Sequence, residues 1–244
     1  MRARPTTNFQ RPTSKMIETV FLDAGGVLVF PNWVRISETM RRHGVAVAPE
    51  ALAAAEPHAK RHLDQTRTIQ ATNDEKRGWL YFNLILERAG ITLSDATTSA
   101  LEELHAYHQA SNLWEFMPAD VLPSLRAIRD MGLKMAIVSN ANGTICAAAD
   151  RLGIGELVDC VLDSHVEGVE KPDARFFEIA LERSGANRNT TIHVGDIYEV
   201  DVVGARAAGI RPVLLDAAGL YPEADCPRVA SLPALVSALA AGEL

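Results

Sequence analysis

Three aspartates and one lysine follow or adjoin buried, strand-like segments of the sequence. Asp23 follows one short apolar run, Asp196 follows another, and Asp201 comes five residues after Asp196. Lys171 stands before a proline and a helical pattern. Carboxylates are the ligands that Mg²⁺ prefers, and an ammonium group suits an anionic oxygen. These residue types together favour metal-assisted displacement at a phosphoryl or similar centre.

Further polar groups extend this candidate site. Ser139 and Asn140 end another apolar run, and with Lys171 they are expected to hold the anionic oxygens of a substrate. Asp23 would attack and form a covalent intermediate, while Asp201 would orient metal-bound water or Lys171. The predicted catalytic residues are Asp23, Ser139 and Lys171; the predicted substrate-binding residues are Ser139, Asn140, Lys171 and Gly26; the predicted ligands of Mg²⁺ are Asp23, the Gly25 carbonyl, Asp196 and Asp201.

Short apolar runs alternate with helical patterns along much of the chain. This alternation predicts an α/β fold, in which a parallel sheet is covered by helices on both faces. Ligands bind such sheets at the carboxyl ends of the strands, so the candidate residues are expected to converge there. The apolar runs span 19–22, 134–139, 160–162, 191–195 and 212–216, and the helical patterns span 120–131, 143–152, 173–184, 200–208 and 229–241.

The long segment between the first apolar run and residue 120 has helical periodicity and no convincing strand. Gly44 and Gly90 stand where two of its helices are expected to stop. The sequence therefore predicts an inserted all-helical domain at 31–117, a core domain formed by 16–30 and 118–244, and a loose N-terminal tail at 1–15. The predicted helices of the insertion span 33–43, 49–65, 75–89 and 94–110.

Composition limits the classes of partner. The formal net charge of −7 argues against a nucleic-acid surface, so a small anionic molecule is the expected partner. No run reaches the roughly 18 apolar residues of a membrane span, and the basic N-terminal stretch lacks the apolar centre of a secretory signal. The three cysteines form no CxxC pair, which favours the reducing cytoplasm. Both a monomer and a homodimer are compatible with these features.

Four short motifs resemble, in order and spacing, those of the haloacid dehalogenase-like hydrolases. The resemblance implies a Rossmann-like core, and the helical insertion is similar to the C1 cap of that family, which closes over substrate and sets its identity. It also implies a Mg²⁺-dependent hydrolase, most often a phosphatase of a small metabolite that works through an aspartyl phosphate. The motifs are Phe-Leu-Asp23-Ala-Gly-Gly-Val-Leu, Val-Ser139-Asn140, Glu-Lys171-Pro172-Asp and His-Val-Gly195-Asp196-Ile-Tyr-Glu-Val-Asp201.

One position departs from the phosphatase pattern of that family. Most of these phosphatases have a second aspartate two residues after the nucleophile, which serves as general acid and base. This chain has Gly25 there. General acid–base catalysis typically contributes about 10²–10⁴-fold, so slow turnover of ordinary monoesters is expected. Substrates with good leaving groups, such as acyl or aryl phosphates, would be affected least.

Three other functions stay open on the sequence alone. Dehalogenases of the superfamily also lack that aspartate, but they work without metal, whereas Gly195 and Asp196 look like the metal-binding form of the last motif. A phosphonatase needs a cap lysine that forms a Schiff base, and Lys60 and Lys76 are candidates by position. The third alternative is a non-catalytic binding protein, and retention of all four charged site residues argues against it.

The helical insertion carries weaker signals. His58 and His62 are four residues apart, as in some metal pairs, but a solvated helix face is the better interpretation. The aromatic residues at 79–82 are expected mostly to pack between helices. The polar stretch from Arg67 to Glu75 is the predicted specificity loop.

Overall fold

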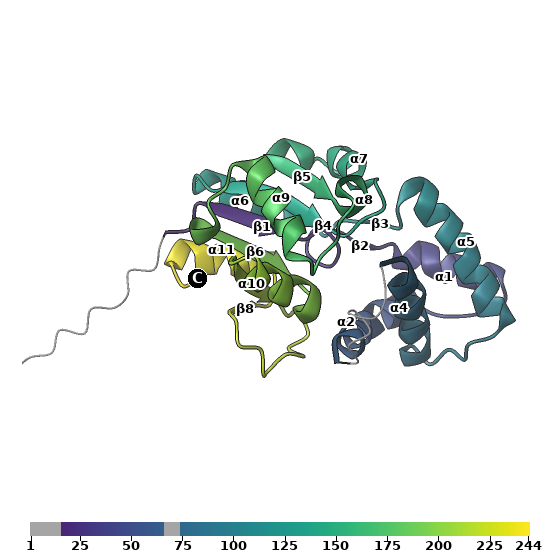
Figure 1. Cartoon of the computed structure of the whole chain (residues 1–244). Helices are drawn as coiled ribbons and strands as arrows, with labels where there is room; N and C mark the ends of the chain where they lie inside the picture. The colour runs from purple at the N-terminus through teal and green to yellow at the C-terminus, as the bar shows by residue number, and fades with distance from the viewer. Residues whose placement is uncertain (1–15, 66–73) are drawn as a thin grey trace, which may run out of the picture.

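A six-stranded parallel sheet forms the centre of the molecule. The computed structural model describes residues 16–65 and 74–244, apart from the side chains of residues 74–78. The strands of the sheet are β1 (Thr19–Leu22), β4 (Lys134–Ser139), β5 (Cys160–Asp163), β6 (Thr191–Gly195), β7 (Arg211–Leu215) and β8 (Arg228–Val229). Their order is β5-β4-β1-β6-β7-β8, which places β1 between β4 and β6 (Figure 1). The predicted α/β fold is confirmed.

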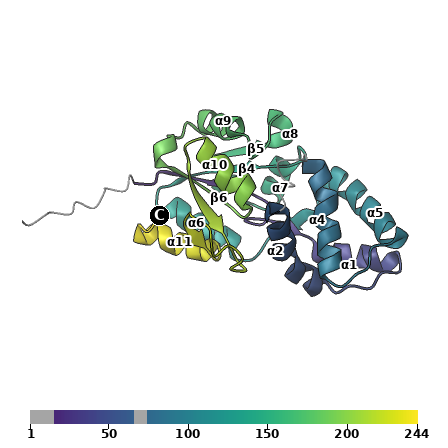
Figure 2. The same ribbon diagram turned by 60° about the horizontal axis from the view of Figure 1, so that its bottom comes forward.

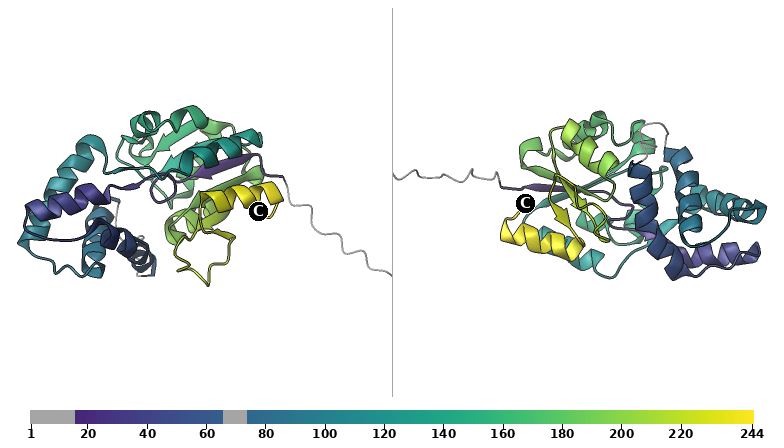
Figure 3. Two further views of the ribbon diagram at one scale, coloured as in Figure 1. Left: turned by 180° about the vertical axis from the view of Figure 1, so that it is seen from behind. Right: turned by 90° about the horizontal axis from the view of Figure 1, so that it is seen from below.

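Helices cover both faces of this sheet, as the sequence predicts. Val20 and Leu22 of β1 belong to an apolar cluster with α6 (Val121–Asp130), α7 (Ile145–Arg151) and α11 (Leu232–Ala241). Phe21 belongs to a second cluster with α9 (Ala174–Ser184) and α10 (Val203–Ala207). Successive side chains of a strand point to opposite faces, so a strand buried on both faces has an uninterrupted apolar run. Figure 3 shows α6 and the yellow helix α11 on the same face.

Local sequence signals set several helix ends. Ser94 and Thr97 form a capping box at the start of one helix of the insertion. The Asp173 side chain accepts a hydrogen bond from the Arg175 N–H at the start of α9, and Gly185 ends that helix in the left-handed conformation. The shorter helical segments are α8 (Ser164–Glu167), η1 (Gly155–Leu157), η2 (Arg188–Thr190) and the π-helical turn η3 (Tyr198–Val202).

Between β1 and α6, four of the described helices form a separate group, called the helical insert below. They are α1 (Trp33–Arg42), α2 (Pro49–Gln65), α4 (Asp74–Arg88) and α5 (Asp95–Ser111), close to the four predicted spans. Their apolar faces pack into a cluster of their own, centred on side chains such as Met40, Leu52 and Ile85. Among these helices, α2 lies on the side that faces the sheet (Figures 1 and 2). The domain boundaries at residues 31 and 117 stay a prediction.

A short antiparallel pair of strands joins the insert to the core. β2 (Phe30–Pro31) pairs with β3 (Trp114–Phe116), so the two connecting segments lie side by side (Figure 1). The sequence analysis found no strand in this segment and was wrong here, because strands of two and three residues are too short to show a period of two. The pairing brings Trp114 beside the end of β1.

Two predictions fall outside the described part of the chain. The first is the predicted N-terminal tail, residues 1–15. The second is the predicted specificity loop from Arg67 to Glu75, because residues 66–73 and the side chains of residues 74–78, among them Lys76, are not described. Among the helices that are described, none combines the length and apolar character that a membrane crossing requires.

Candidate active site

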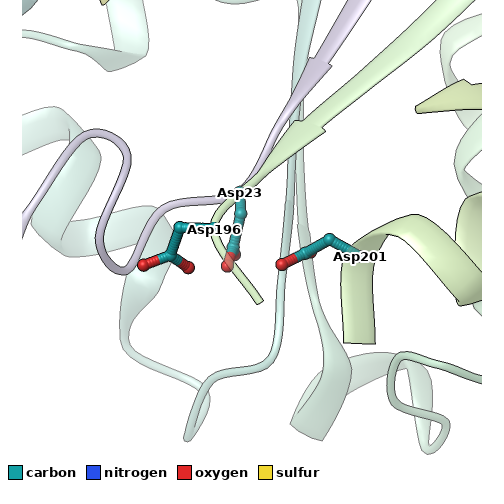
Figure 4. Close-up of side chains that lie close together, drawn as sticks. All are labelled: Asp23, Asp196 and Asp201. Atoms are coloured by element: carbon teal, nitrogen blue, oxygen red, sulfur yellow. The ribbon is translucent and has the colours of Figure 1, made fainter. Parts of the chain in front are cut away.

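Three carboxylates meet at the carboxyl edge of the sheet. Asp23 follows β1, Asp196 follows β6, and Asp201 lies on η3 (Figure 4). One oxygen of each carboxylate lies within 4.8 Å of the others. The sequence predicted this convergence, because ligand-binding residues of a parallel sheet gather at the carboxyl ends of its strands. In the structure β1 and β6 are neighbours, which brings Asp23 and Asp196 together.

Two glycines make this close approach possible. A Cβ atom at Gly195 would overlap the Asp201 carboxylate, and a Cβ atom at Gly26 would overlap the side chains of Asp196 and Lys60. Gly26 also has a φ of +81°, in the left-handed region where other residues are strained. Gly26 therefore leaves room for Asp196 beside the turn; its predicted contact with substrate stays a prediction.

Lys171 joins two of the carboxylates. Its Nζ atom lies 2.9 Å from Asp23 Oδ1 and 2.7 Å from Asp201 Oδ1, and its side chain is fully buried. Burial by itself lowers the pKa of an ammonium group, but the carboxylates of Asp201 and Asp23 raise the pKa of Lys171 above its ordinary value. The group is therefore a fixed positive charge beside Asp23; its predicted contact with anionic oxygens of a substrate stays a prediction.

His193 is part of the site but was given no role by the sequence analysis. His193 lies on β6, and its Nε2 atom is 2.9 Å from Oδ1 of Asp201 on η3. Burial lowers the pKa of His193, so the ring is neutral and its Nε2–H donates to the carboxylate. Burial alone would raise the pKa of Asp201, but Lys171 and His193 hold it below its usual range. A histidine inside an apolar strand was the signal that sequence reasoning passed over.

Ser139 and Asn140 lie at the end of β4, at the same edge. Ser139 is buried and lines the cavity described below. Both ends of the Asn140 amide contact the backbone of Lys171: Oδ1 accepts its N–H at 2.8 Å, and Nδ2 donates to its carbonyl oxygen at 3.0 Å. The geometry makes Asn140 a positioning residue for Lys171, and its predicted contact with substrate stays a prediction.

The helical insert contributes Lys60 to the site. The sequence analysis named this residue only by its position, as a candidate Schiff-base lysine. Lys60 on α2 makes ion pairs with Asp196 in the core and with Glu56 one turn earlier. Tyr81 donates a hydrogen bond to Glu56 at 3.0 Å. Burial lowers the pKa of Lys60, but the carboxylates of Asp196 and Glu56 raise it above its ordinary value. Lys60 is therefore a charged ammonium group at the edge of the metal-ligand cluster.

Asp64 forms a second contact between α2 and the core. Its carboxylate accepts hydrogen bonds from the N–H groups of Tyr198 and Glu199, both at 2.9 Å, and from the Tyr221 hydroxyl. Glu56, Lys60 and Asp64 are spaced by four residues and form one buried stripe of α2. That spacing was visible in the sequence, but only the packing of α2 on the core distinguishes the stripe from a solvated face.

The net charge at this edge of the sheet favours binding of a divalent cation. The carboxylates of Glu56, Asp23, Asp196 and Asp201 face the ammonium groups of Lys60 and Lys171, an excess of two negative charges when all are ionised. Burial, with the neighbouring carboxylates, raises the pKa of Asp196 to about 7 although Lys60 opposes this. Asp196 Oδ1 is buried and has no hydrogen-bond partner in the described residues. An oxygen-rich site with a deficit of positive charge fits Mg²⁺.

A cavity of about 740 Å³ extends from Asp23 to the insert. Its core side includes Asp23, Ser139 and Lys171. Its insert side combines aliphatic and polar side chains, such as Leu101 and Gln109, with six aromatic rings. These rings belong to Trp79, Tyr81, Phe82, His105, His108 and Trp114. The volume is in the range that takes a small organic ligand, roughly 300–1,000 Å³.

Comparisons with known proteins agree with this arrangement. The family model for haloacid dehalogenase-like hydrolases matches residues 17–209. Phosphatase MT3486 from Mycobacterium tuberculosis is 32% identical over 234 residues, which cover 90% of this chain and 97% of that protein. Glyceraldehyde 3-phosphate phosphatase from Methanopyrus kandleri is 29% identical, with 80% and 82% covered. The magnesium-bound HAD-hydrolase YfnB from Bacillus subtilis has the same fold, with a TM-score of 0.67, 14% identity, and 92% of this chain and 99% of that chain covered.

Proposed function

Because this chain belongs to the haloacid dehalogenase-like hydrolase family, we propose that it is a Mg²⁺-dependent phosphatase of a small phosphorylated metabolite, with Asp23 as nucleophile. The observation that carries the proposal is the cluster of Asp23, Asp196 and Asp201 with an excess of negative charge and an unpaired buried oxygen on Asp196. The two phosphatases similar to this chain support the same reaction class.

Asp23 is placed for attack on phosphorus. Its Oδ1 atom accepts hydrogen bonds from the Ala24 N–H at 2.7 Å and from Lys171, which fixes the carboxylate and leaves Oδ2 outside both contacts. In the proposed reaction Oδ2 attacks, the bond to the leaving oxygen breaks with its electron pair, and an aspartyl phosphate forms. Water then attacks that acyl phosphate and releases inorganic phosphate, a proton and the Asp23 carboxylate.

The remaining residues hold the phosphoryl group and the metal. Lys171 and the Ser139 hydroxyl would bind phosphoryl oxygens. Asp201 keeps Lys171 charged and in place, and His193 holds Asp201 by a hydrogen bond. Asp23, Asp196, Asp201 and the Gly25 carbonyl would hold Mg²⁺, which when bound offsets the repulsion between an anionic phosphate and Asp23. Asn140 keeps the backbone of Lys171 in register with β4.

Two structural observations weigh against the alternatives. A dehalogenase needs no cation, whereas Asp196 has a buried oxygen without a partner among the described residues. A Schiff base needs a neutral amine, whereas the Lys60 ammonium is held between Asp196 and Glu56. Both observations favour phosphate ester hydrolysis over the other two reactions.

One screen tests the proposal. The purified protein is assayed against phosphate esters, acyl phosphates, phosphonates and 2-haloacids, first after exhaustive chelation and then with Mg²⁺ restored. We expect phosphate release from esters that is lost on chelation and recovered with Mg²⁺. Chloride release that survives chelation, or cleavage of phosphonates alone, would contradict the proposal.

A further inference from the structure

We propose that the leaving group of the substrate is an aromatic oxygen, so that the substrate class is a phosphate monoester of a phenol with a flat apolar ring system. This inference rests on the proposed phosphatase function. Two independent features of the cavity carry it: what covers Gly25, and what lines the insert side.

The first feature concerns protonation of the leaving oxygen. Trp114 covers Gly25: its indole Nε1 and Cδ1 atoms lie 3.3 and 3.4 Å from where a Cβ atom at this position would stand. The indole N–H is a hydrogen-bond donor that does not give up its proton near neutral pH. The group closest to this position is therefore a donor that can orient a leaving oxygen without protonating it.

The nearby histidine does not supply the missing acid at this point. The His108 ring is 5.3 Å from the Trp114 ring, centroid to centroid. Its Nδ1 atom accepts the backbone N–H of Leu113 at 3.0 Å. An imidazolium has protons on both nitrogens and could not accept this bond, so the contact favours the neutral ring, which is a poor acid. A leaving group that departs as a stable anion matches such a site, because it needs no proton in the transition state.

The second feature is the wall that faces the leaving group. Phe82 packs against Tyr81 and Trp114, with ring centroids 5.0 and 5.9 Å apart, and Trp79 packs against His105 at 5.3 Å. Flat aromatic groups stack favourably on such surfaces. A sugar would have to exchange the hydrogen bonds of its hydroxyl groups with water for contact with these rings, which costs binding free energy.

The charges in the cavity argue in the same direction. In the part of the chain that the structure describes, the ammonium groups that line this cavity are Lys60 and Lys171. Both are paired with carboxylates. A leaving group with a phosphate of its own would find no unneutralised ammonium group among these residues, whereas an uncharged aromatic ring needs none.

The reaction balances without a proton donor. Asp23 Oδ2 forms the bond to phosphorus, the P–O bond to the ring breaks, and the electron pair leaves on the phenolate oxygen. A phenol has a pKa of about 10, far below that of an alcohol, so its anion is a competent leaving group. Hydrolysis of the aspartyl phosphate releases one proton, and the phenolate takes up one proton in bulk water.

Four esters separate the leaving-group argument from the stacking argument. Phenyl and 2-naphthyl phosphate have similar phenolic leaving groups but different ring areas; benzyl phosphate has a ring but leaves as an alkoxide; glycerol 3-phosphate has neither property. With Mg²⁺ present, we expect the naphthyl ester to bind with a KM about tenfold below that for the phenyl ester, from the extra apolar area buried. We expect the kcat of both aryl esters to exceed that of benzyl phosphate by at least about 10²-fold.

A pair of variants on α4 tests the wall. Phe82→Ala removes a ring that lines the cavity, and we expect it to raise the KM for the naphthyl ester about tenfold and that for the phenyl ester less. Phe82→Leu serves the same test if the alanine variant does not fold. Leu80→Ala is the matched control, because Leu80 is exposed on the same helix and does not line the cavity; all four esters should keep their kinetic constants.

The possible outcomes are distinguishable. Similar kcat values for benzyl and phenyl phosphate, a glycerol phosphate kcat/KM equal to that of the aryl esters, or an unchanged naphthyl-to-phenyl KM ratio in the Phe82 variants would overturn the aryl assignment and leave the phosphatase function standing. If none of the four esters nor an acyl phosphate releases phosphate, the proposed function itself fails.

Discussion

The two sides of the cavity bury polar groups in different ways. On the core side Lys171 and Asp201 each have several fixed partners: Lys171 contacts Asp23 and Asp201, and Asp201 also accepts from His193. On the insert side six aromatic rings line the cavity, and Lys60 on α2 is the ammonium group that the described insert residues contribute to it. Under the proposed function, the core would determine which bond is broken, and the insert would determine which molecule is bound.

The largest effect is expected from Asp23→Asn, on the core side. An amide is a poor nucleophile, and loss of a nucleophile in a preorganised site costs at least roughly 10⁴-fold in kcat. Every substrate should lose activity equally, because the change does not touch the insert. Asp95→Asn, on the first turn of α5, is the matched control and should keep full activity. If Asp23→Asn lost much less than roughly 10⁴-fold in kcat, or lost different factors on different substrates, a covalent mechanism at Asp23 would be contradicted.

The next largest effect is expected from Gly25→Asp, where the two sides meet. The new carboxyl group would restore an acid, and the rate on benzyl phosphate should rise by up to roughly 10²-fold, with little gain on phenyl phosphate. Trp114 sets the limit, because a Cβ atom at position 25 would lie 3.3 Å from its Nε1 atom and the indole must shift by a few tenths of an ångström. Equal gains on both esters would show that the lack of an acid to protonate the leaving oxygen does not limit the rate of the original protein.

Much of the core side could be predicted from the sequence. Asp23, Ser139 and Asp196 directly follow or end apolar runs, and parallel strands end at one edge, so their convergence followed from topology alone. For Asp201 the sequence left open whether it orients metal-bound water or Lys171, and the structure pairs it with Lys171. The contribution of His193 did not follow from topology, because its role depends on the depth of burial beside Asp201.

The insert side could be predicted only as secondary structure. Helical periodicity placed α1, α2, α4 and α5 closely, yet it did not show which face of α2 meets the core. The His58 and His62 pair attracted attention by spacing, but both residues lie on the exposed face, while Lys60 and Asp64 reach the site. Packing between distant segments selects that face, and spacing along one helix carries no information about it.

A smaller effect concerns metal binding and pH. Burial raises the pKa of Asp196 from 3.8 to about 7, so below that pH its protonated form predominates and cannot bind Mg²⁺. The dissociation constant for Mg²⁺, measured by titration calorimetry, should fall about tenfold from pH 6 to pH 8 and then level off, with proton release on binding. In the metal-free protein the folded state binds this proton more tightly than the unfolded state, so the stability should fall as pH rises between these two pKa values. A dissociation constant that is independent of pH would contradict the placement of Asp196 as a ligand.

The smallest effect is expected at Asp64, which holds α2 to the core without facing the substrate. Asp64→Ala removes the acceptor for the N–H groups of Tyr198 and Glu199. Loss of one net hydrogen bond corresponds to about a fivefold change in an opening equilibrium, so hydrogen exchange at these two amides should accelerate by about that factor. The KM for an aryl ester should rise by a similar factor, because α2 and Lys60 lie less often against Asp196, while kcat stays near its original value. His58→Ala, on the exposed face of the same helix, should change neither quantity. If Asp64→Ala instead lowered kcat as strongly as a change on the core side, the division between a core that reacts and an insert that binds would be wrong.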